Sequence, residues 1–281
     1  MRMGEKRRIK RGFSSILLAV FSIIYVSPLF IILFNSFKSK TFISLEPFKL
    51  PTEETWVGLE NYESGIYDYG LLGSVGWTLM ITAGSVFAIL FFCSMFSWFI
   101  TRTKAFYSRL LFLLCVFSMV VPFQMVMFTL SKTADTLKLN TPWGIIVVYL
   151  GFGAGLAVFL FSGFVKSIPI EIEEAAMIDG CGPITIFFRI VLPMMRPTFI
   201  TVGILQTMWI WNDFLLPYLV LDQRHYKTIS MIIQMMKGSF GRVDMGAIMA
   251  CLVVAVIPMI VFYLAAQKHI IEGVTAGAVK G

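Results

Sequence analysis

Side chains that could act as nucleophiles or metal ligands are few in this chain and do not gather in the sequence. The two histidines are His225 and His269, and they are far apart. The four cysteines stand singly, without the CxxC spacing of zinc or redox sites, at Cys93, Cys115, Cys181 and Cys251. No Ser/His/Asp group or pair of acids falls within the long apolar segments. The sequence therefore predicts no enzyme activity, no disulfide framework, no bound metal and no cofactor held by this chain.

Polar residues gather instead in one stretch, EEAAMIDGCGPITIFFRIVLP, which runs from Glu173 to Pro193. Ser167 and Pro169 precede it, and these residue types cap and open helices. The acids that follow suit a helix N-terminus, and the GCGP sequence favours a sharp turn. An apolar stripe at helical spacing comes next, made of Ile184, Phe187, Phe188 and Val191. The stretch therefore predicts a short helix, a turn and a second, amphipathic helix.

The elements that must position this stretch are long apolar segments. The chain is 58% hydrophobic and 14% charged, whereas a soluble domain carries about 25% charged residues. Six segments of at least 22 residues lack charges, except for Asp213 in the fifth, and about 20 apolar residues cross a hydrocarbon core. They are residues 12–37, 69–101, 110–131, 139–165, 197–221 and 245–267. We expect an all-α polytopic membrane protein with six transmembrane helices.

Arginine and lysine residues predict the orientation of these helices. Six of them lie within residues 1–11, and 14 of the 23 in the chain fall on the side of both termini. Because positive loops stay in the cytoplasm, we expect both termini there. The domain organisation is then a basic tail (1–13), a membrane domain (14–267) with a cytoplasmic loop at about 166–196, and a C-terminal tail (268–281). The basic tail is explained by topology and anionic lipid, so nucleic-acid binding is not expected.

The cytoplasmic loop carries a recognisable pattern. Glu174-Ala175-Ala176 is followed by Asp179-Gly180 and then by an Ile-x-Leu-Pro sequence that ends at Pro193. The pattern resembles the "EAA" loop of ATP-binding-cassette importer permeases, and it falls between the fourth and fifth expected spans, as in that family. The tail EGVTAGAVKG (272–281) and the segment WNDFLLPYLVL, from Trp211, are similar to the carbohydrate-uptake, maltose-permease-like branch.

The resemblance implies a permease subunit that forms half of a sugar-translocation pore in a bacterial or archaeal cytoplasmic membrane. Its partners would be a second, paralogous permease, two ATP-binding-cassette ATPases and an extracellular solute-binding protein, with a mono- or oligosaccharide as substrate. The first short helix would be a coupling helix that faces the ATPase with Glu173, Glu174, Ala175, Ala176, Asp179 and Gly180. The second would face the chain's own membrane helices. ATP and Mg²⁺ would be bound by the ATPase, since this chain has no G-x-x-x-x-G-K-[ST] sequence.

Substrate contacts are predicted around the acid of the fifth segment. An intramembrane acid usually faces a cavity or a partner, so Asp213 could hold structure by hydrogen bonds or line the sugar pathway. Trp209, Trp211 and Asn212 adjoin it and suit carbohydrate binding. Gln124 is a further candidate because it follows Pro122, and a proline frees backbone groups and commonly marks a break in a helix.

One alternative function stays open at this point. In a proton-coupled secondary transporter, Asp213 would carry the proton, and the chain would transport without ATP. Against this alternative, the sequence shows no convincing internal repeat and too few membrane acids for a relay.

Overall fold

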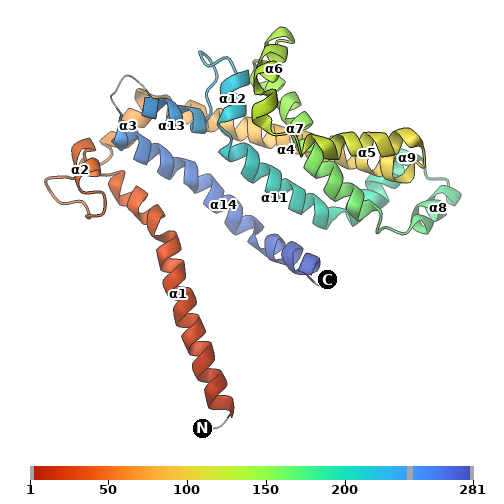
Figure 1. Cartoon of the computed structure of the whole chain (residues 1–281), viewed down its shortest axis with the longest axis horizontal. Coiled ribbons are helices and arrows are strands. Elements are labelled where there is room, and N and C mark those ends of the chain that lie inside the picture. The colour runs from red at the N-terminus through yellow and green to blue at the C-terminus, as the bar shows by residue number, and fades with distance from the viewer. Residues whose placement is uncertain (1–2, 239–242, 279–281) are drawn as a thin grey trace. The chain divides into compact units, whose positions relative to one another are not determined.

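The structure is a computed structural model that describes residues 3–238 and 243–278, with side chains over 14–237 and 243–268. Within these residues the chain is helical, and strand pairing is limited to one bridge between Lys38 and Trp56 (Figure 1). The elements are α1 (Met3–Asn35), α2 (Lys40–Leu45), α3 (Glu60–Tyr67), α4 (Leu71–Arg102), α5 (Phe106–Ser118), α6 (Phe123–Thr136), α7 (Pro142–Val165), α8 (Ile170–Ile178), α9 (Pro183–Ile186), the π-helical turn η1 (Phe187–Val191), α10 (Leu192–Met194), α11 (Arg196–Asn212), α12 (Leu215–Val220), α13 (Ile229–Gly238) and α14 (Met245–Ala278).

Within residues 3–238 and 243–278, four helical segments are long and apolar enough to cross a membrane, and two bent helix pairs pass the same test. The four are Ser14–Asn35, α4, α7 and Met245–Lys268. In the first pair, α5 and α6 meet at 105°, and in the second, the helices of 183–194 meet α11 at 75°. By length and composition, the described residues therefore hold four candidate spans, or up to six if each bent pair counts as one. Four predicted segments coincide with the straight candidate spans and the third, 110–131, falls in the first bent pair, whereas the fifth, predicted at 197–221, is displaced, because the second bent pair covers 183–212.

Proline and a polar side chain account for the breaks. The predicted break near Pro122 is confirmed, since α5 ends at Ser118 and α6 begins directly after Pro122, which is its N-cap. The expected continuous helix over 197–221 is wrong, because α11 ends at Asn212 and α12 begins only at Leu215. Asp213 lies in this break with an extended backbone.

The chain divides into two compact units. The first consists of residues 1–71 and 233–258 and the second of residues 72–232 and 259–281. In the first unit, the apolar side chains of α1 are largely exposed along the candidate span Ser14–Asn35. In the loop that follows α1, the Phe37 ring stacks on Trp56 with ring centroids 5.0 Å apart and also contacts Tyr62. The loop after α1 is thus an ordered structure.

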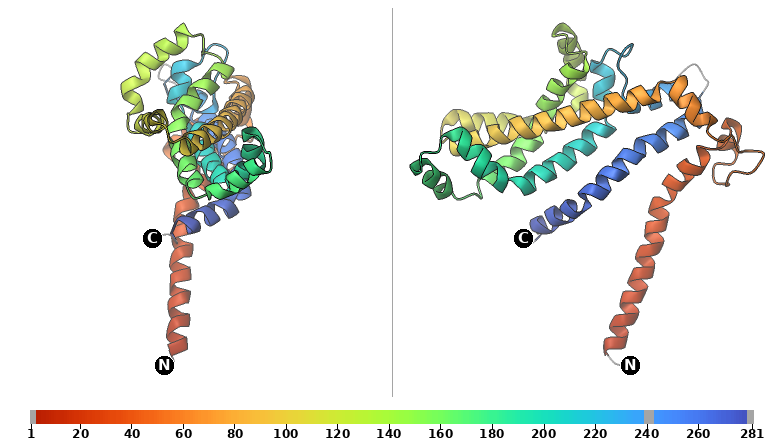
Figure 2. Two further views of the ribbon diagram at one scale, coloured as in Figure 1. Left: turned by 90° about the vertical axis from the view of Figure 1, so that its right-hand side faces the viewer. Right: turned by 180° about the vertical axis from the view of Figure 1, so that it is seen from behind.

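The second unit contains the stretch that the sequence singled out. Here α7 packs against α5 on one side and α11 on the other (Figure 2). Small residues of α7 allow close approach of α5 and also of α4: a Cβ built on Gly155 would lie 2.8 Å from the Cys115 carbonyl oxygen of α5, and one on Gly153 would lie 2.5 Å from Ile89 of α4. Two glycines of the 151–155 segment therefore serve close helix packing.

Candidate functional site

The predicted helix, turn and second helix form at 170–194. α8 begins after Pro169, which is its N-cap and carries no side-chain cap. The expectation that Ser167 caps this helix is wrong, because the Ser167 hydroxyl donates to the Phe164 carbonyl at 2.7 Å. Such a bond back into the preceding helix competes with capping. Ser167 therefore ends α7 instead of starting α8.

Gly180 ends α8 in a Schellman motif. Its φ is +83°, a left-handed conformation that glycine adopts without strain. The Gly180 amide donates to the Met177 carbonyl at 3.0 Å, and the Cys181 amide donates to the Ala176 carbonyl at 2.9 Å. Gly182 has an ordinary negative φ of −72° and is the N-cap of α9, in which Pro183 occupies the first turn. Only one of the two glycines therefore needs its conformational freedom.

Glu173 attaches α8 to the end of α4. Its carboxylate accepts from Trp98 Nε1 at 2.9 Å and from Arg102 Nε at 2.9 Å, and Arg102 Nη2 lies 2.7 Å from Oε1. Arg102 also donates to the Ile168 carbonyl at 2.9 Å, just before α8. Glu173 is 3% exposed. The expectation that its side chain faces outward is therefore wrong, and its physical role is to hold α8 against α4.

The outward surface of α8 is made by other residues. Glu174, Ala175, Asp179 and Gly180 are exposed, whereas Ala176 is buried. Four large apolar side chains of α8 are also exposed, namely Ile170, Ile172, Met177 and Ile178, the last of them 87% exposed. The exposed set thus combines acids, small residues and apolar groups on one short helix.

The second helix packs only in part as predicted. Phe187 and Val191 are buried, and the Phe187 ring lies 5.5 Å from that of Trp98. Phe188 is partly exposed and Ile184 is 73% exposed, so the four residues do not form one buried stripe. Ile186 is buried in place of Ile184, so the buried face of this helix consists of Ile186, Phe187 and Val191.

Asp213 stands at the centre of a hydrogen-bonded cluster between α7, α11 and α12. Its Oδ2 accepts from the Tyr149 hydroxyl at 3.0 Å, and its Oδ1 accepts from the amides of Leu215 at 3.0 Å and Leu216 at 3.4 Å. Tyr149 is buried, and the Trp209 ring meets it edge-on at 5.5 Å. The Asp213 carboxylate therefore satisfies the first amides of α12 at the break.

The other predicted substrate contacts are not part of this cluster, and they differ in how far their side chains are exposed. Trp211 is buried, whereas Asn212 is exposed and donates to the Met208 carbonyl at 2.7 Å. Gln124 is exposed on α6. Of the candidates, Trp209 and Asp213 are thus brought together through Tyr149, which the sequence did not single out. No local pattern marks Tyr149, Trp98 or Arg102, because each is identified only by a partner at least 60 residues away.

Among the side chains that the structure describes, no three His, Cys, Asp or Glu residues are close enough to hold a metal ion. His269 and the tail of 272–281 lie outside those described side chains, as do the basic residues of 1–13.

Comparison with known proteins places residues 94–275 in a family model described as "binding-protein-dependent transport system inner membrane component". The chain is 36% identical over 277 residues to a probable starch degradation products transport system permease protein, AmyC, of Thermoanaerobacterium thermosulfurigenes, covering 98% of this chain and 99% of that one. It is 32% identical to the multiple sugar-binding transport system permease protein MsmG of Streptococcus mutans, over 99% and 100% of the two chains.

A third relative is the melibiose/raffinose/stachyose import permease protein MelC of Bacillus subtilis, 31% identical over 95% of this chain and 96% of that one. Among solved structures, a chain of a bacterial ABC transporter involved in the import of the acidic polysaccharide alginate superposes with a TM-score of 0.77. The match has 20% identity and covers 94% of this chain and 97% of that one, so it shows the same fold.

Proposed function

The chain belongs to the family of binding-protein-dependent transport system inner membrane components, and we propose that it is the permease subunit of an ATP-driven sugar importer. The observation that carries this proposal is similarity over the whole length to sugar permeases, at 36% identity for 98% of the chain. The apolar helices agree with an integral membrane protein. Relatives of this kind are permease subunits, so ATP hydrolysis falls to a partner and this chain has no catalytic role.

The coupling role is assigned to α8. In the proposed arrangement, the exposed surface of Glu174, Ala175, Met177 and Ile178 docks on a cytoplasmic ATPase. When two ATPases close on ATP, α8 moves with them, and the Glu173 contacts with Arg102 and Trp98 carry the movement to α4. The support for this assignment is that α8 is fixed on one side and exposed on the other. Glu173 thus serves coupling from inside the chain.

The proposed topology follows from the coupling role. The loop at about 166–196 lies in the cytoplasm, as do the basic tail of 1–13 and the C-terminal tail of 268–281, and residues 14–267 form the membrane domain of a bacterial or archaeal cytoplasmic membrane. A second permease completes the pore, and a solute-binding protein delivers a mono- or oligosaccharide from outside. One of the structural neighbours was solved together with a periplasmic protein bound to an alginate pentasaccharide.

The sugar pathway is proposed to run past the exposed polar and aromatic candidates. Asn212, Gln124 and Trp209 have exposed side chains, whereas Trp211 is buried and would act only by shaping the helix. Asp213 uses both carboxylate oxygens in hydrogen bonds to its own chain. We therefore assign it to the support of the pathway and not to direct sugar contact.

The test is purification of the complex through this chain after mild extraction, followed by mass spectrometry and uptake of labelled oligosaccharides. An ATP-binding-cassette ATPase and a second permease are expected to copurify. The variant Glu174→Lys should lose the ATPase and uptake, while Glu54→Lys, an exposed acid in the first loop, should keep the ATPase attached. Uptake by the chain alone, abolished by an uncoupler and independent of ATP, would contradict the proposal in favour of a proton-coupled transporter.

A further inference from the structure

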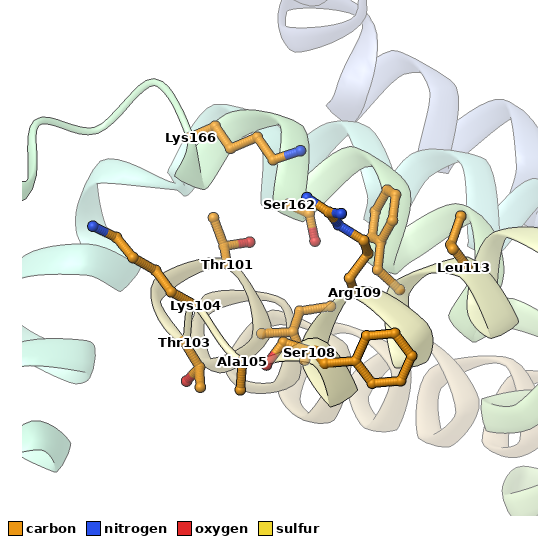
Figure 3. A pocket seen from close by; sticks show the side chains of 12 residues that line it. Thr101, Thr103, Lys104, Ala105, Ser108, Arg109, Leu113, Ser162 and Lys166 are labelled. Carbon is orange, nitrogen blue, oxygen red and sulfur yellow. The ribbon is translucent and has the colours of Figure 1, made fainter.

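A cavity of about 750 Å³ opens where α4 ends, α5 begins and α7 ends. Figure 3 shows the side chains that line it. They come from the end of α4 and the loop after it, from the first two turns of α5, and from the last residues of α7 with Lys166. All of these elements belong to the second unit. None of these residues entered the coupling element or the candidate sugar pathway described above.

Positive charge gathers at this cavity without a matching acid. Arg109 and Lys166 direct their charged ends toward Ser162, whereas Lys104 points away from it (Figure 3). The Lys166 amine lies 5.3 Å from the centre of the Phe112 ring. In the part of the chain that the structure describes, no carboxylate lies within ion-pairing distance of these three cations. Two unpaired cations that converge on one space favour an anion there.

Hydroxyl groups without partners provide the second, independent observation. The hydroxyls of Thr101, Ser108 and Ser162 are buried and have no hydrogen-bond partner within the described structure. Ser162 is 1% exposed and Ser108 is 3% exposed. In Figure 3 the Thr101 and Ser162 hydroxyls point into the space below Lys166. A buried hydroxyl left unpaired costs about 1–3 kcal/mol, so these groups call for an acceptor inside the cavity.

The rim of the cavity indicates where that acceptor comes from. Phe106 is 82% exposed, and Leu113 is also exposed one to two turns further along α5. The apolar segment of 110–131 begins directly after Arg109 and contains Leu113, so Phe106 and Arg109 lie at the depth of lipid headgroups and Leu113 lies at the depth of acyl chains. Basic pockets between membrane helices on the cytoplasmic side bind anionic headgroups.

We propose that this cavity binds a phosphate group through Arg109, Lys166 and the hydroxyls of Thr101, Ser108 and Ser162, and that an anionic phospholipid of the inner leaflet supplies it. A phosphate diester offers oxygen acceptors that match a guanidinium fork, an ammonium and several hydroxyl donors. The apolar rim favours a lipid over free phosphate, because only a lipid has acyl chains that can contact the rim. Only the choice of the inner leaflet rests on the proposed topology.

The experiment is native mass spectrometry of the intact complex in mild detergent, titrated with phosphatidylglycerol, with phosphatidylcholine as the neutral comparison. Each Lys or Arg near a lipid surface contributes roughly fivefold to affinity, so Arg109→Gln with Lys166→Gln should weaken phosphatidylglycerol binding about thirtyfold. The control Arg196→Gln removes an exposed cation that does not line the cavity and should bind like the wild type.

A second variant, Ser162→Ala, tests whether weakened lipid binding could result from misfolding. It removes a buried hydroxyl that has no partner, so it should not lower the thermal stability of the complex but should weaken phosphatidylglycerol binding severalfold. Unchanged binding in the double variant would overturn the proposal. Binding of inorganic phosphate without binding of phosphatidylglycerol would overturn the lipid source. Because the measurement is lipid retention, its result is independent of which sugar is imported.

Discussion

The substitution Glu173→Gln tests the attachment of α8 to α4 without changing the exposed surface of α8 that is proposed to dock on the ATPase. The substitution keeps the shape of the side chain but removes the charge that faces Arg102 and accepts from Trp98. Its matched control is Glu174→Gln, which makes the same chemical change on the exposed side of the same helix turn.

The magnitude follows from the burial of the pair. Removing one partner of a buried ion pair costs about 3–5 kcal/mol. Arg102 is 18% exposed at its side chain and keeps its bond to the Ile168 carbonyl, so the cost falls to about 2–3 kcal/mol. At about 1.4 kcal/mol per tenfold change, detachment of α8 from α4 becomes roughly 30- to 150-fold more frequent.

Hydrogen–deuterium exchange of the peptide over 170–180 in the purified complex measures this detachment. Glu173→Gln should lose protection there by one to two orders of magnitude, in step with the opening equilibrium. Transport should fall relative to ATP hydrolysis, because the ATPase still binds the outer surface of α8 but moves a loosened helix. Glu174→Gln should leave exchange unchanged. If both variants exchange like the wild type, or equally fast, the assignment of Glu173 as the inner attachment is wrong.

Three other predictions concern single positions. Asp213→Asn should preserve uptake, because an amide oxygen still accepts from Tyr149 or from the α12 amides, at a stability cost of about 1 kcal/mol in thermal unfolding; abolished uptake at unchanged stability would favour a proton carrier instead. Gly180→Ala should cost about 1–2 kcal/mol because of the left-handed φ of +83°, and unchanged thermal unfolding would contradict that strain. Lys38 is fully buried and donates to the Glu46 carbonyl, and its burial lowers its pKa below the usual 10.5. Between that lowered pKa and 10.5 the unfolded chain binds more protons than the folded one, so the wild type should gain stability over Lys38→Met as pH rises through this window and show no such trend below it.

Features decided by neighbouring residues were predictable from the sequence. The turn after α8 needs a residue with positive φ followed by a helix start, and Gly180 and Pro183 supply both within four positions. The break at Pro122 has the same local origin. Apolar length alone located the four straight candidate spans, since a hydrocarbon core excludes charged side chains whatever the tertiary packing.

Features decided by distant contacts were not predictable. An acid near the start of a helix is favourable whether it faces solvent or an arginine, so no local feature predicts that Glu173 is buried and Glu174 exposed. The helix break at Asp213 was missed for a similar reason. The residues on both sides are apolar, and the break depends on a carboxylate that caps α12 while it accepts from Tyr149, 64 positions earlier.

The two adjacent glutamates show how one short helix can be both fixed and exposed. Consecutive residues of an α-helix point about 100° apart, so Glu173 turns toward Arg102 while Glu174 remains outside. Without the inner contact, α8 would be joined to the membrane domain only by its flanking segments, which are free to bend. With that contact, displacement of the outer surface must move the end of α4 as well, since Arg102 binds both Glu173 and the Ile168 carbonyl. In the proposed importer, a partner that displaces α8 therefore acts directly on a membrane-spanning helix.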